Sequence, residues 1–320
     1  MRYRPHKYQK YAANFILEHP VCCLMLDMGL GKTVITLTAL WELALDRFDI
    51  GRILVIAPKR VATDTWPKEL QKWEHLAGLN ASLVVGSQKQ REEALARSAF
   101  IYIINRENVS WLVQNYRWDF DTVVIDELSS FKSNKAERFK AMKKVRPLVN
   151  RVIGLTGTPA PNSLLDLWPQ MYLLDMGQRL GRFITGYRER FFTPDKRNRE
   201  IIYSYKPREG AEKAIYSLIS DICISMKAVD YLDMPECIYN RVEVEMSRKE
   251  RKIYDDFCRD MVVQIGEEEL DAVSAGALSN KLLQMANGAV YNSDRKVLPI
   301  HDRKLDALED LVEAANGKPL

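Results

Sequence analysis

Short apolar runs alternate with longer segments of helical spacing through the first half of the chain. The apolar runs, each about as long as a buried strand, fall at 21–26, 52–57, 82–85, 100–104, 122–125 and 152–155. Apolar residues recur with the helical period between them, most clearly at 8–18, 33–48 and 63–77. Strands that alternate with helices favour a parallel sheet covered by helices on both faces. We therefore predict an α/β fold with a central parallel sheet.

From residue 164 onward helical spacing dominates, and we predict a helical insertion at about 164–225. A polar stretch with two prolines at 192–208 is expected to form an exposed loop or hairpin. The dipeptide Met234-Pro235 is typical of a boundary. Beyond it the pattern predicts a strand at 238–246 and helices at 247–265, 267–285 and 304–315. The sequence thus predicts a first domain at 1–228 and a mainly helical segment at 229–320.

The first apolar run leads into a glycine-containing loop, and the loop leads into a helix that we expect to begin at Thr33. The loop reads Asp27-Met28-Gly29-Leu30-Gly31-Lys32-Thr33. This is the context of a phosphate-binding P-loop, because the glycines let backbone N–H groups point at phosphate oxygens. Lys32 is predicted to contact the β- and γ-phosphates, and Thr33 to supply an oxygen to Mg²⁺. Leu26 stands where the full pattern has its first glycine; an ordinary glycine turn is the alternative.

Two carboxylates, Asp126 and Glu127, follow the fifth apolar run. Adjacent acids at a strand end are common by chance, but downstream of a P-loop they indicate a metal-orienting Asp126 and a Glu127 that activates water. Thr156-Gly157-Thr158 follow the next run, and their hydroxyls are predicted to sense the γ-phosphate. Gln9 is a candidate to read adenine, because a carboxamide donates and accepts hydrogen bonds together. The sequence therefore predicts a site for ATP and Mg²⁺.

The net charge is only +4, but the basic residues are clustered. Runs rich in Lys and Arg lie at 1–10, 132–151 and 179–213, whereas 243–271 is acidic. Further polar and basic residues, Lys59-Arg60 and Asn105-Arg106, follow predicted strands, where open parallel sheets place their ligands. A single basic run is usually a solvated surface, but three of them around one nucleotide site favour a nucleic-acid partner.

Composition adds little beyond these points. Hydrophobic residues make up 47% and charged residues 28%, which is ordinary for a globular protein. No apolar stretch has membrane-spanning length and no signal-peptide pattern opens the chain. The five cysteines form no C-x-x-C pair, which favours reduced structural thiols over metal ligands. We therefore expect a cytoplasmic protein of a bacterial or phage-infected cell, with no membrane partner.

With these residues in place, the chain resembles the superfamily 2 helicase-like ATPases, and among them the Swi/Snf-type DNA translocases. The likeness is carried by Tyr8-Gln9 (Q motif), Asp27 to Thr33 (motif I), Pro58 to Trp66 (motif Ia), Asp126-Glu127-Leu128-Ser129 (DEAH box) and Leu155 to Asn162. The resemblance implies a RecA-like P-loop NTPase lobe. It also implies contacts to DNA by the stretch like motif Ia and by Lys132, which lies where the family has a Lys-Asn pair.

The chain departs from the family pattern in several places. Leu128-Ser129 replaces Ala-His or Gly-His, and Ser225-Met226-Lys227 reduces an Arg-Arg-x-Lys end, so a bacterial or phage member fits better than a chromatin remodeller. No motif IV, V or VI is present, and family members carry arginine fingers there, in a second RecA-like lobe. We expect a monomeric fragment that holds the first lobe and the helical start of the second, and that hydrolyses ATP weakly by itself.

The leading interpretation is the motor lobe of an ATP-dependent double-stranded DNA translocase or helicase that contacts the DNA backbone independently of sequence. A helicase acting on single-stranded DNA or RNA is the alternative within the class. No aromatic-rich stacking stripe is evident, which favours the duplex. A non-hydrolysing, nucleotide-gated DNA-binding protein is the alternative from another class, and ATP turnover discriminates between the two.

Overall fold

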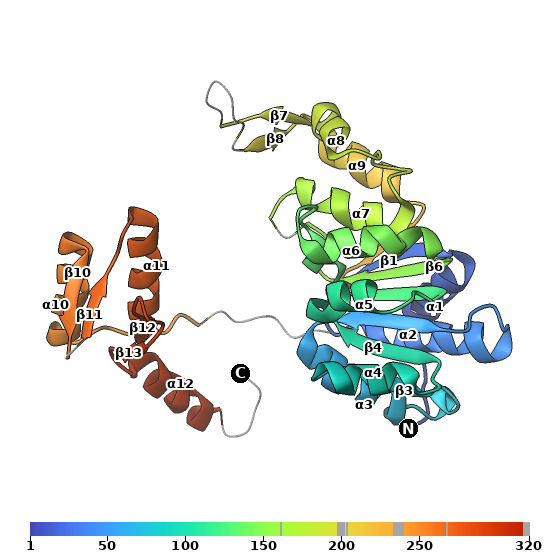
Figure 1. The fold of residues 1–320 in the computed structure, drawn as a ribbon, viewed down its shortest axis with the longest axis horizontal. Coiled ribbons are helices and arrows are strands. Elements are labelled where there is room, and N and C mark those ends of the chain that lie inside the picture. The colour runs from blue at the N-terminus through green and yellow to red at the C-terminus, as the bar shows by residue number, and fades with distance from the viewer. Residues whose placement is uncertain (161, 197–201, 203, 233–239, 267, 316–320) are drawn as a thin grey trace. The chain divides into compact units, whose positions relative to one another are not determined.

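The computed structural model describes residues 1–320 except 161, 197–201, 203, 233–239, 267 and 316–320 (Figure 1). The chain forms two compact units, Met1–Met234 and Pro235–Leu320. The sequence marks Met234-Pro235 as a boundary, while our predicted first domain ended slightly earlier, at 228. No described helix is long and apolar enough to cross a membrane.

Unit 1 is built on a seven-stranded sheet in the order β3-β4-β2-β5-β6-β1-β9, and all of its strand pairs are parallel. Six strands confirm the predicted runs: β1 (Val21–Leu26), β2 (Ile53–Ala57), β3 (Ala81–Val84), β4 (Ile101–Asn105), β5 (Thr122–Asp126) and β6 (Arg151–Thr156). The seventh strand, β9 (Cys223–Met226), lies inside the stretch that we predicted to be helical. It is a short edge strand, and a run of four residues carries little periodicity.

Helices cover both faces of this sheet (Figure 1). Alternate residues of each strand belong to two separate cores: Cys22 and Leu24 of β1 pack with one layer, and Cys23 and Met25 with the other. The first layer contains α1 (Lys7–Glu18), α2 (Lys32–Trp41) and α3 (Trp66–Lys72). The second contains α4 (Gln88–Ala96), α5 (Val109–Asn115), α6 (Glu137–Val145) and α7 (Leu167–Asp175). The predicted α/β architecture is therefore confirmed.

Two predicted helices are interrupted by turns of wider winding. The helix expected at 33–48 consists of α2 followed by a π-helical turn, η1 (Glu42–Asp46). The helix expected at 63–77 is divided into a π-helical turn, η2 (Val61–Thr65), then α3, then a 3₁₀ turn, η3 (Glu74–Leu76). π-Turns insert single residues into a helix and often lie at functional sites.

The region predicted as a helical insertion contains α7, α8 (Ile184–Phe191) and α9 (Ala211–Ile219). Between α8 and α9 the chain forms an antiparallel hairpin of β7 (Phe192–Pro194) and β8 (Tyr205–Pro207). This hairpin confirms one of the two forms that we predicted for 192–208. The region packs onto the α7 side of the sheet, because Tyr187 of α8 and Ile215 of α9 join the second core.

Unit 2 combines helices with two antiparallel hairpins. Its elements are α10 (Arg248–Asp260), β10 (Val262–Ile265), β11 (Glu268–Asp271), α11 (Ala275–Met285), β12 (Ala289–Tyr291), β13 (Val297–Pro299) and α12 (Arg303–Ala314). A small core around Phe257, Leu270 and Met285 joins α10, α11 and the two hairpins.

Three predictions for this unit are wrong in part. Residues 240–246 of the strand predicted at 238–246 form no strand, and residues 238 and 239 lie outside the described part. The helix predicted at 247–265 ends at Asp260, and the one predicted at 267–285 begins only at Ala275. Met261 ends α10 in the left-handed conformation (φ 58°), and a β-branched stretch then favours the hairpin over a continued helix.

Candidate functional site

The carboxyl ends of β5, β6 and β1 lie side by side, because these three strands are neighbours in the sheet. Asp126 at the end of β5 pairs in register with Leu155 of β6, and Thr156 of β6 pairs with Met25 of β1. The sheet therefore brings the predicted phosphate loop, the two carboxylates and the Thr156-Gly157-Thr158 turn to one edge. This grouping follows from parallel pairing alone.

The loop between β1 and α2 requires glycine at two positions. Gly29 and Gly31 have φ of 85° and 79°, a left-handed conformation that side chains disfavour. A Cβ on Gly31 would lie 2.9 Å from Nε2 of Gln9 and 3.3 Å from Cγ1 of Val34. The loop thus curls closely against α1, and it delivers Lys32 and Thr33 to the first turn of α2, whose amino end favours an anion.

The side chain of Lys32 folds back onto this loop. Its Nζ donates hydrogen bonds to the carbonyl oxygens of Leu26 at 2.7 Å and Asp27 at 3.2 Å. Burial lowers the pKa of Lys32, whereas the nearby carboxylates of Asp126, Glu127 and Asp27 act in the opposite direction. Two neutral carbonyl oxygens thus hold the ammonium group. Charged phosphate oxygens attract an ammonium group more strongly and can replace these carbonyls.

Asp126 and Glu127 occupy different environments. Oδ2 of Asp126 accepts a 2.8 Å hydrogen bond from Nε1 of Trp66. Burial raises the pKa of Asp126, and this hydrogen bond opposes the rise. Glu127 has a φ of 56°, and its Oε1 accepts a hydrogen bond from the hydroxyl of Ser129. The strained backbone turns Glu127 out of the strand direction, so the adjacent carboxylates need not share one role.

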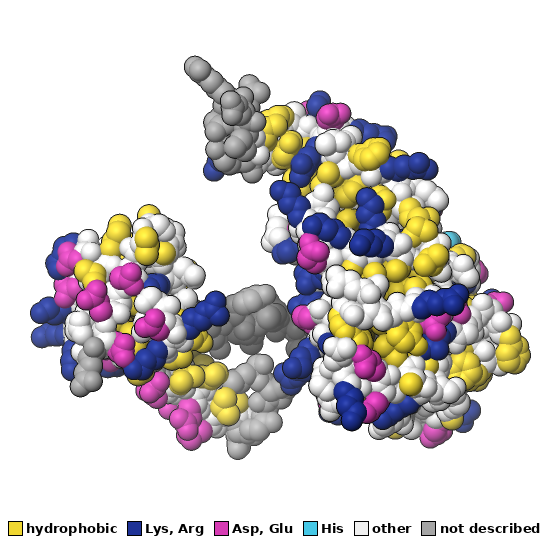
Figure 2. All heavy atoms as spheres, in the orientation of Figure 1, with side chains coloured by type: hydrophobic (Ala, Val, Ile, Leu, Met, Phe, Trp, Pro, Cys, Tyr) yellow, Lys and Arg dark blue, Asp and Glu magenta, His cyan; other side chains and the backbone are white. Residues whose placement is uncertain are grey.

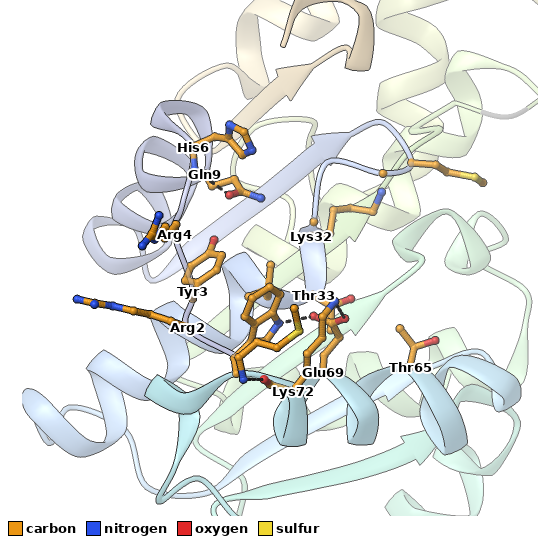
Figure 3. Close-up of a pocket in the computed structure, with 16 residues that line it drawn as sticks. Arg2, Tyr3, Arg4, His6, Gln9, Lys32, Thr33, Thr65, Glu69 and Lys72 are labelled. Carbon is orange, nitrogen blue, oxygen red and sulfur yellow. Dashed lines mark hydrogen bonds and ion pairs between the residues drawn. The ribbon is translucent and has the colours of Figure 1, made fainter. Parts of the chain in front are cut away.

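A cavity of about 740 Å³ opens beside the phosphate loop (Figure 3). Gln9 lies at its wall, where Oε1 accepts from the backbone N–H of His6 (2.9 Å) and Nε2 donates weakly to the carbonyl of Leu30 (3.4 Å). The lining also includes residues that were not predicted from the sequence: Met1, Arg2, Tyr3, Arg4, His6, Val34, Thr65, Glu69, Lys72 and Trp73. Figure 3 shows Arg4, His6 and Gln9 along one side of the cavity and Glu69 and Lys72 along another.

The amino-terminal arm reaches this cavity through aromatic contacts. The ring of Tyr3 stacks on His75 with centroids 4.9 Å apart and meets Trp73 edge-on at 5.1 Å. Burial is the main cause that raises the pKa of Tyr3 to about 12. Arg2 and Arg4 flank Tyr3 in the sequence. The basic character of this stretch was the only feature of the sequence that indicated a role for the arm.

The turn after β6 lies against the phosphate loop. A Cβ on Gly157 would stand 3.5 Å from the carbonyl oxygen of Leu26 and 3.9 Å from Nζ of Lys32. The backbone N–H of Thr158 donates to Oγ1 of Thr156 at 3.2 Å. This turn is therefore within reach of a group bound next to Lys32.

The residues predicted to contact DNA differ in exposure. Lys59, Arg60 and Lys132 are exposed at carboxyl ends of strands or just beyond them. Asn105 is only 6% exposed, and its amide donates to Glu107 and accepts from Asn108. Arg106 is half-buried and pairs with Glu107 at 2.9 Å. Three of the five are free to meet a phosphate backbone, while Asn105 holds its turn together.

Basic side chains also gather elsewhere on unit 1. Figure 2 shows Lys and Arg side chains over the part of the surface that α6, α7 and α8 form. Exposed members near α6 are Lys132, Lys135, Lys140, Lys143 and Lys144. These five lysines belong to the basic run noted at 132–151.

The donor set fits a magnesium nucleotide. The loop has no room for a Cβ at Gly31, as expected where backbone must approach phosphates closely. The hydroxyl of Thr33 and the carboxylate of Asp126 are hard oxygen donors, which Mg²⁺ prefers. No group of three or more His, Cys, Asp or Glu side chains suited to hold a metal by itself occurs among the described residues.

A seven-stranded parallel sheet with this loop at its edge defines a P-loop ATPase fold. The SNF2-related domain matches residues 8–296, and the chain belongs to that family. The predicted resemblance to Swi/Snf-type ATPases is thereby confirmed.

Individual relatives agree with this family. Protein p41 of Acyrthosiphon pisum secondary endosymbiont phage 1 is 36% identical over 99% of this chain and 71% of its own length. The uncharacterized ATP-dependent helicase MG018 of Mycoplasma genitalium is 27% identical over 91% of this chain, and Helicase SWR1 of Saccharomyces cerevisiae is 26% identical over 78%. The chain spans only 27% and 18% of those two relatives.

A solved structure has the same fold. It is the Sulfolobus solfataricus SWI2/SNF2 ATPase core in complex with dsDNA, with a TM-score of 0.61 and 22% identity. The match covers 98% of this chain and 65% of that chain.

Proposed function

We propose that this chain is the ATP-binding and ATP-hydrolysing motor lobe of an ATP-dependent translocase or helicase that acts on double-stranded DNA. The observation that carries the proposal is the meeting of Lys32, Asp126 and Thr156 at one edge of the sheet, beside an open cavity. Membership of the SNF2-related family supports nucleotide use.

In this proposal each group has a separate task. The backbone from Met28 to Gly31 binds the phosphates, and Lys32 leaves the carbonyls of Leu26 and Asp27 to contact the β- and γ-phosphates. Thr33 and Asp126 would hold Mg²⁺, which when bound neutralises charge on the phosphate oxygens. Glu127 accepts the proton of the attacking water.

Two further groups complete the site. Gln9, at the cavity wall, reads the adenine edge with its carboxamide. Thr156 and Thr158 lie next to the loop that would hold the γ-phosphate, so their turn is suited to respond to its loss.

Duplex DNA is proposed to lie across the exposed strand-end turns. Lys59, Arg60 and Lys132 supply positive charge for phosphate contacts, with Arg106 beside them and Asn105 bracing the turn. Contacts of this kind read the backbone and not the bases, so binding is independent of sequence. The description of the Sulfolobus core as a complex with dsDNA supports the choice of duplex.

Turnover by residues 1–320 alone is proposed to be slow. The groups brought together here contact ATP mainly in its ground state, whereas an arginine finger contributes about 10³ to 10⁵ in rate in phosphoryl transfer. In this proposal a second lobe supplies that arginine, as in motors of the resembling type.

Phosphate release measured with duplex DNA, single-stranded DNA, RNA or no nucleic acid tests this proposal. We expect ATP hydrolysis that depends on Lys32 and is highest with duplex DNA. Highest activity with single strands or RNA would favour the other helicase class. Tight ATP and DNA binding with no hydrolysis, even in a protein with both lobes, would favour a nucleotide-gated DNA-binding protein.

A further inference from the structure

The indole of Trp66 is the neighbour that fixes the carboxylate of Asp126. Trp66 is fully buried, and its Nε1 donates to Oδ2 of Asp126 at 2.8 Å although 60 residues separate the two in the chain. A partly buried carboxylate that accepts a directed N–H bond loses rotational freedom, so its remaining lone pairs keep a defined direction. Trp66 therefore constrains the orientation of the Asp126 carboxylate at the end of β5.

A continuous hydrogen-bonded segment joins Trp66 to the exposed Lys59-Arg60 turn. The backbone N–H of Ala62 donates to Pro58 at 2.8 Å, and the hydroxyl of Thr63 donates to the carbonyl of Lys59 at 3.0 Å. The segment closes with a π-type bond from the N–H of Trp66 to the carbonyl of Val61. These bonds link the exposed turn to the backbone of Trp66, and π-turns of this kind often lie at functional sites.

We propose that Trp66 is a positioning residue that ties the carboxylate of Asp126 to the Lys59-Arg60 turn, so that duplex DNA at the turn and Mg²⁺·nucleotide at the carboxylate strengthen each other's binding. This inference rests on the proposed function, because it needs both ligands. The inference adds a physical connection between the two ligands, which runs through the indole N–H of Trp66 and the π-helical turn η2. By thermodynamic reciprocity, each ligand changes the affinity for the other by the same factor.

The test compares Trp66→Phe with the wild-type chain. The variant keeps an aromatic ring in the core and removes the N–H donor. Partners that hydrogen-bond a metal-binding carboxylate commonly contribute about 10- to 100-fold to metal affinity. We therefore expect Mn²⁺ affinity in the presence of ADP, measured by electron paramagnetic resonance, to fall about tenfold. ADP affinity without metal should stay unchanged.

The same variants test whether nucleotide and DNA strengthen each other's binding. The quantity measured is the affinity for duplex DNA with and without Mg²⁺·ADP. We expect Mg²⁺·ADP to raise the wild-type affinity about fivefold or more and to leave that of Trp66→Phe nearly unchanged. The matched control is Trp168→Phe, since Trp168 of α7 is also buried and its indole donates to the carbonyl of Gly181 at 2.9 Å. This control should keep both the metal affinity and the coupling.

Three outcomes would overturn the inference. These are wild-type metal affinity and coupling in Trp66→Phe, an equal loss in Trp168→Phe, and a wild-type chain that binds both ligands without coupling. Failure of the wild-type chain to bind nucleotide or DNA at all would instead overturn the proposed function.

A measurement on the wild-type chain covers the case in which Trp66→Phe does not fold. The chain has six tryptophans, so ¹⁵N labelling gives six indole N–H signals, and Phe variants of the other five assign Trp66. We expect its signal to move when Mg²⁺·ADP binds and also when duplex DNA binds alone. A Trp66 signal that stays in place on addition of duplex would contradict the connection.

Discussion

The ammonium group of Lys32 donates a 2.7 Å hydrogen bond to the backbone carbonyl oxygen of Leu26, the residue that replaces the first glycine of the P-loop pattern. The side chain of Leu26 points into the core and is fully buried. Every amino acid supplies the same carbonyl, so this contact survives the loss of the glycine. The departure from the motif therefore leaves the lysine held in place.

Replacing Lys32 with Ala should lower ATP affinity about 10- to 100-fold, because the phosphates lose a charge-assisted partner worth about 1.5–3 kcal/mol. Titration calorimetry with ATP and Mg²⁺ measures the change. Lys144→Ala, on the exposed face of α6, is the matched control and should bind as the wild-type chain does. Unchanged affinity in Lys32→Ala would contradict the phosphate-binding role of the loop.

Replacing Gly31 with Ala should damage the site in two ways. The left-handed conformation at φ 79° costs a residue with a Cβ about 1–2 kcal/mol. The new methyl carbon would also lie 2.9 Å from Nε2 of Gln9. We expect a lower free energy of unfolding by about that amount in chemical denaturation and weaker ATP binding in calorimetry.

The control for this variant is Gly186→Ala in α8, where a Cβ would meet nothing within 4 Å. Alanine is favoured over glycine inside a helix by about 0.5–1 kcal/mol, so this change should be neutral or stabilising. Equal behaviour of the two alanine variants would mean that the loop does not need its glycine.

Replacing Lys59 and Arg60 with Glu should weaken duplex binding for all sequences alike. Log affinity falls as log salt concentration rises, and each phosphate contact contributes about 0.9 to the steepness of this fall. The double variant loses two contacts, so its slope should be shallower by about 2. Fluorescence anisotropy with two unrelated duplexes at several salt concentrations measures both effects.

A charge-matched control uses the opposite edge of the sheet. Arg97 and Arg117 are exposed and precede β4 and β5, so Arg97→Glu with Arg117→Glu makes the same change of charge away from the strand ends. This pair should reduce affinity only slightly through the overall field. A slope that the first pair leaves unchanged would place the DNA elsewhere.

Much of this fold could be predicted from the sequence, because most strands of the sheet are short apolar runs, as expected for a sheet covered on both faces. The grouping of Lys32, Asp126 and Thr156 followed as well, since parallel strands end at one edge. β9 was missed because a four-residue edge strand has too little pattern to recognise. The hairpin of β10 and β11 was missed because its apolar residues also fit a helical spacing.

Other parts of the site depend on tertiary structure that no local pattern contains. The contact between Trp66 and Asp126 joins residues 60 apart in the chain, at the point where the π-turn meets α3. The position of Tyr3 depends on stacking with His75, which is distant in sequence. Asn105 fits a DNA contact by its place at the carboxyl end of β4, and only its burial and hydrogen bonds show that its amide is already used.

The most direct measurement of the central claim is ADP formation from ATP under single-turnover conditions, with the chain in excess over nucleotide and duplex DNA present. The comparison is with Glu127→Gln, which keeps the shape of the side chain and removes the base, while Glu93→Gln on the exposed face of α4 serves as the control. We predict slow but complete conversion by the wild-type chain and the control, and ATP that stays bound and intact in Glu127→Gln. Conversion at the wild-type rate by Glu127→Gln, or bound ATP that the wild-type chain never converts, would contradict the account.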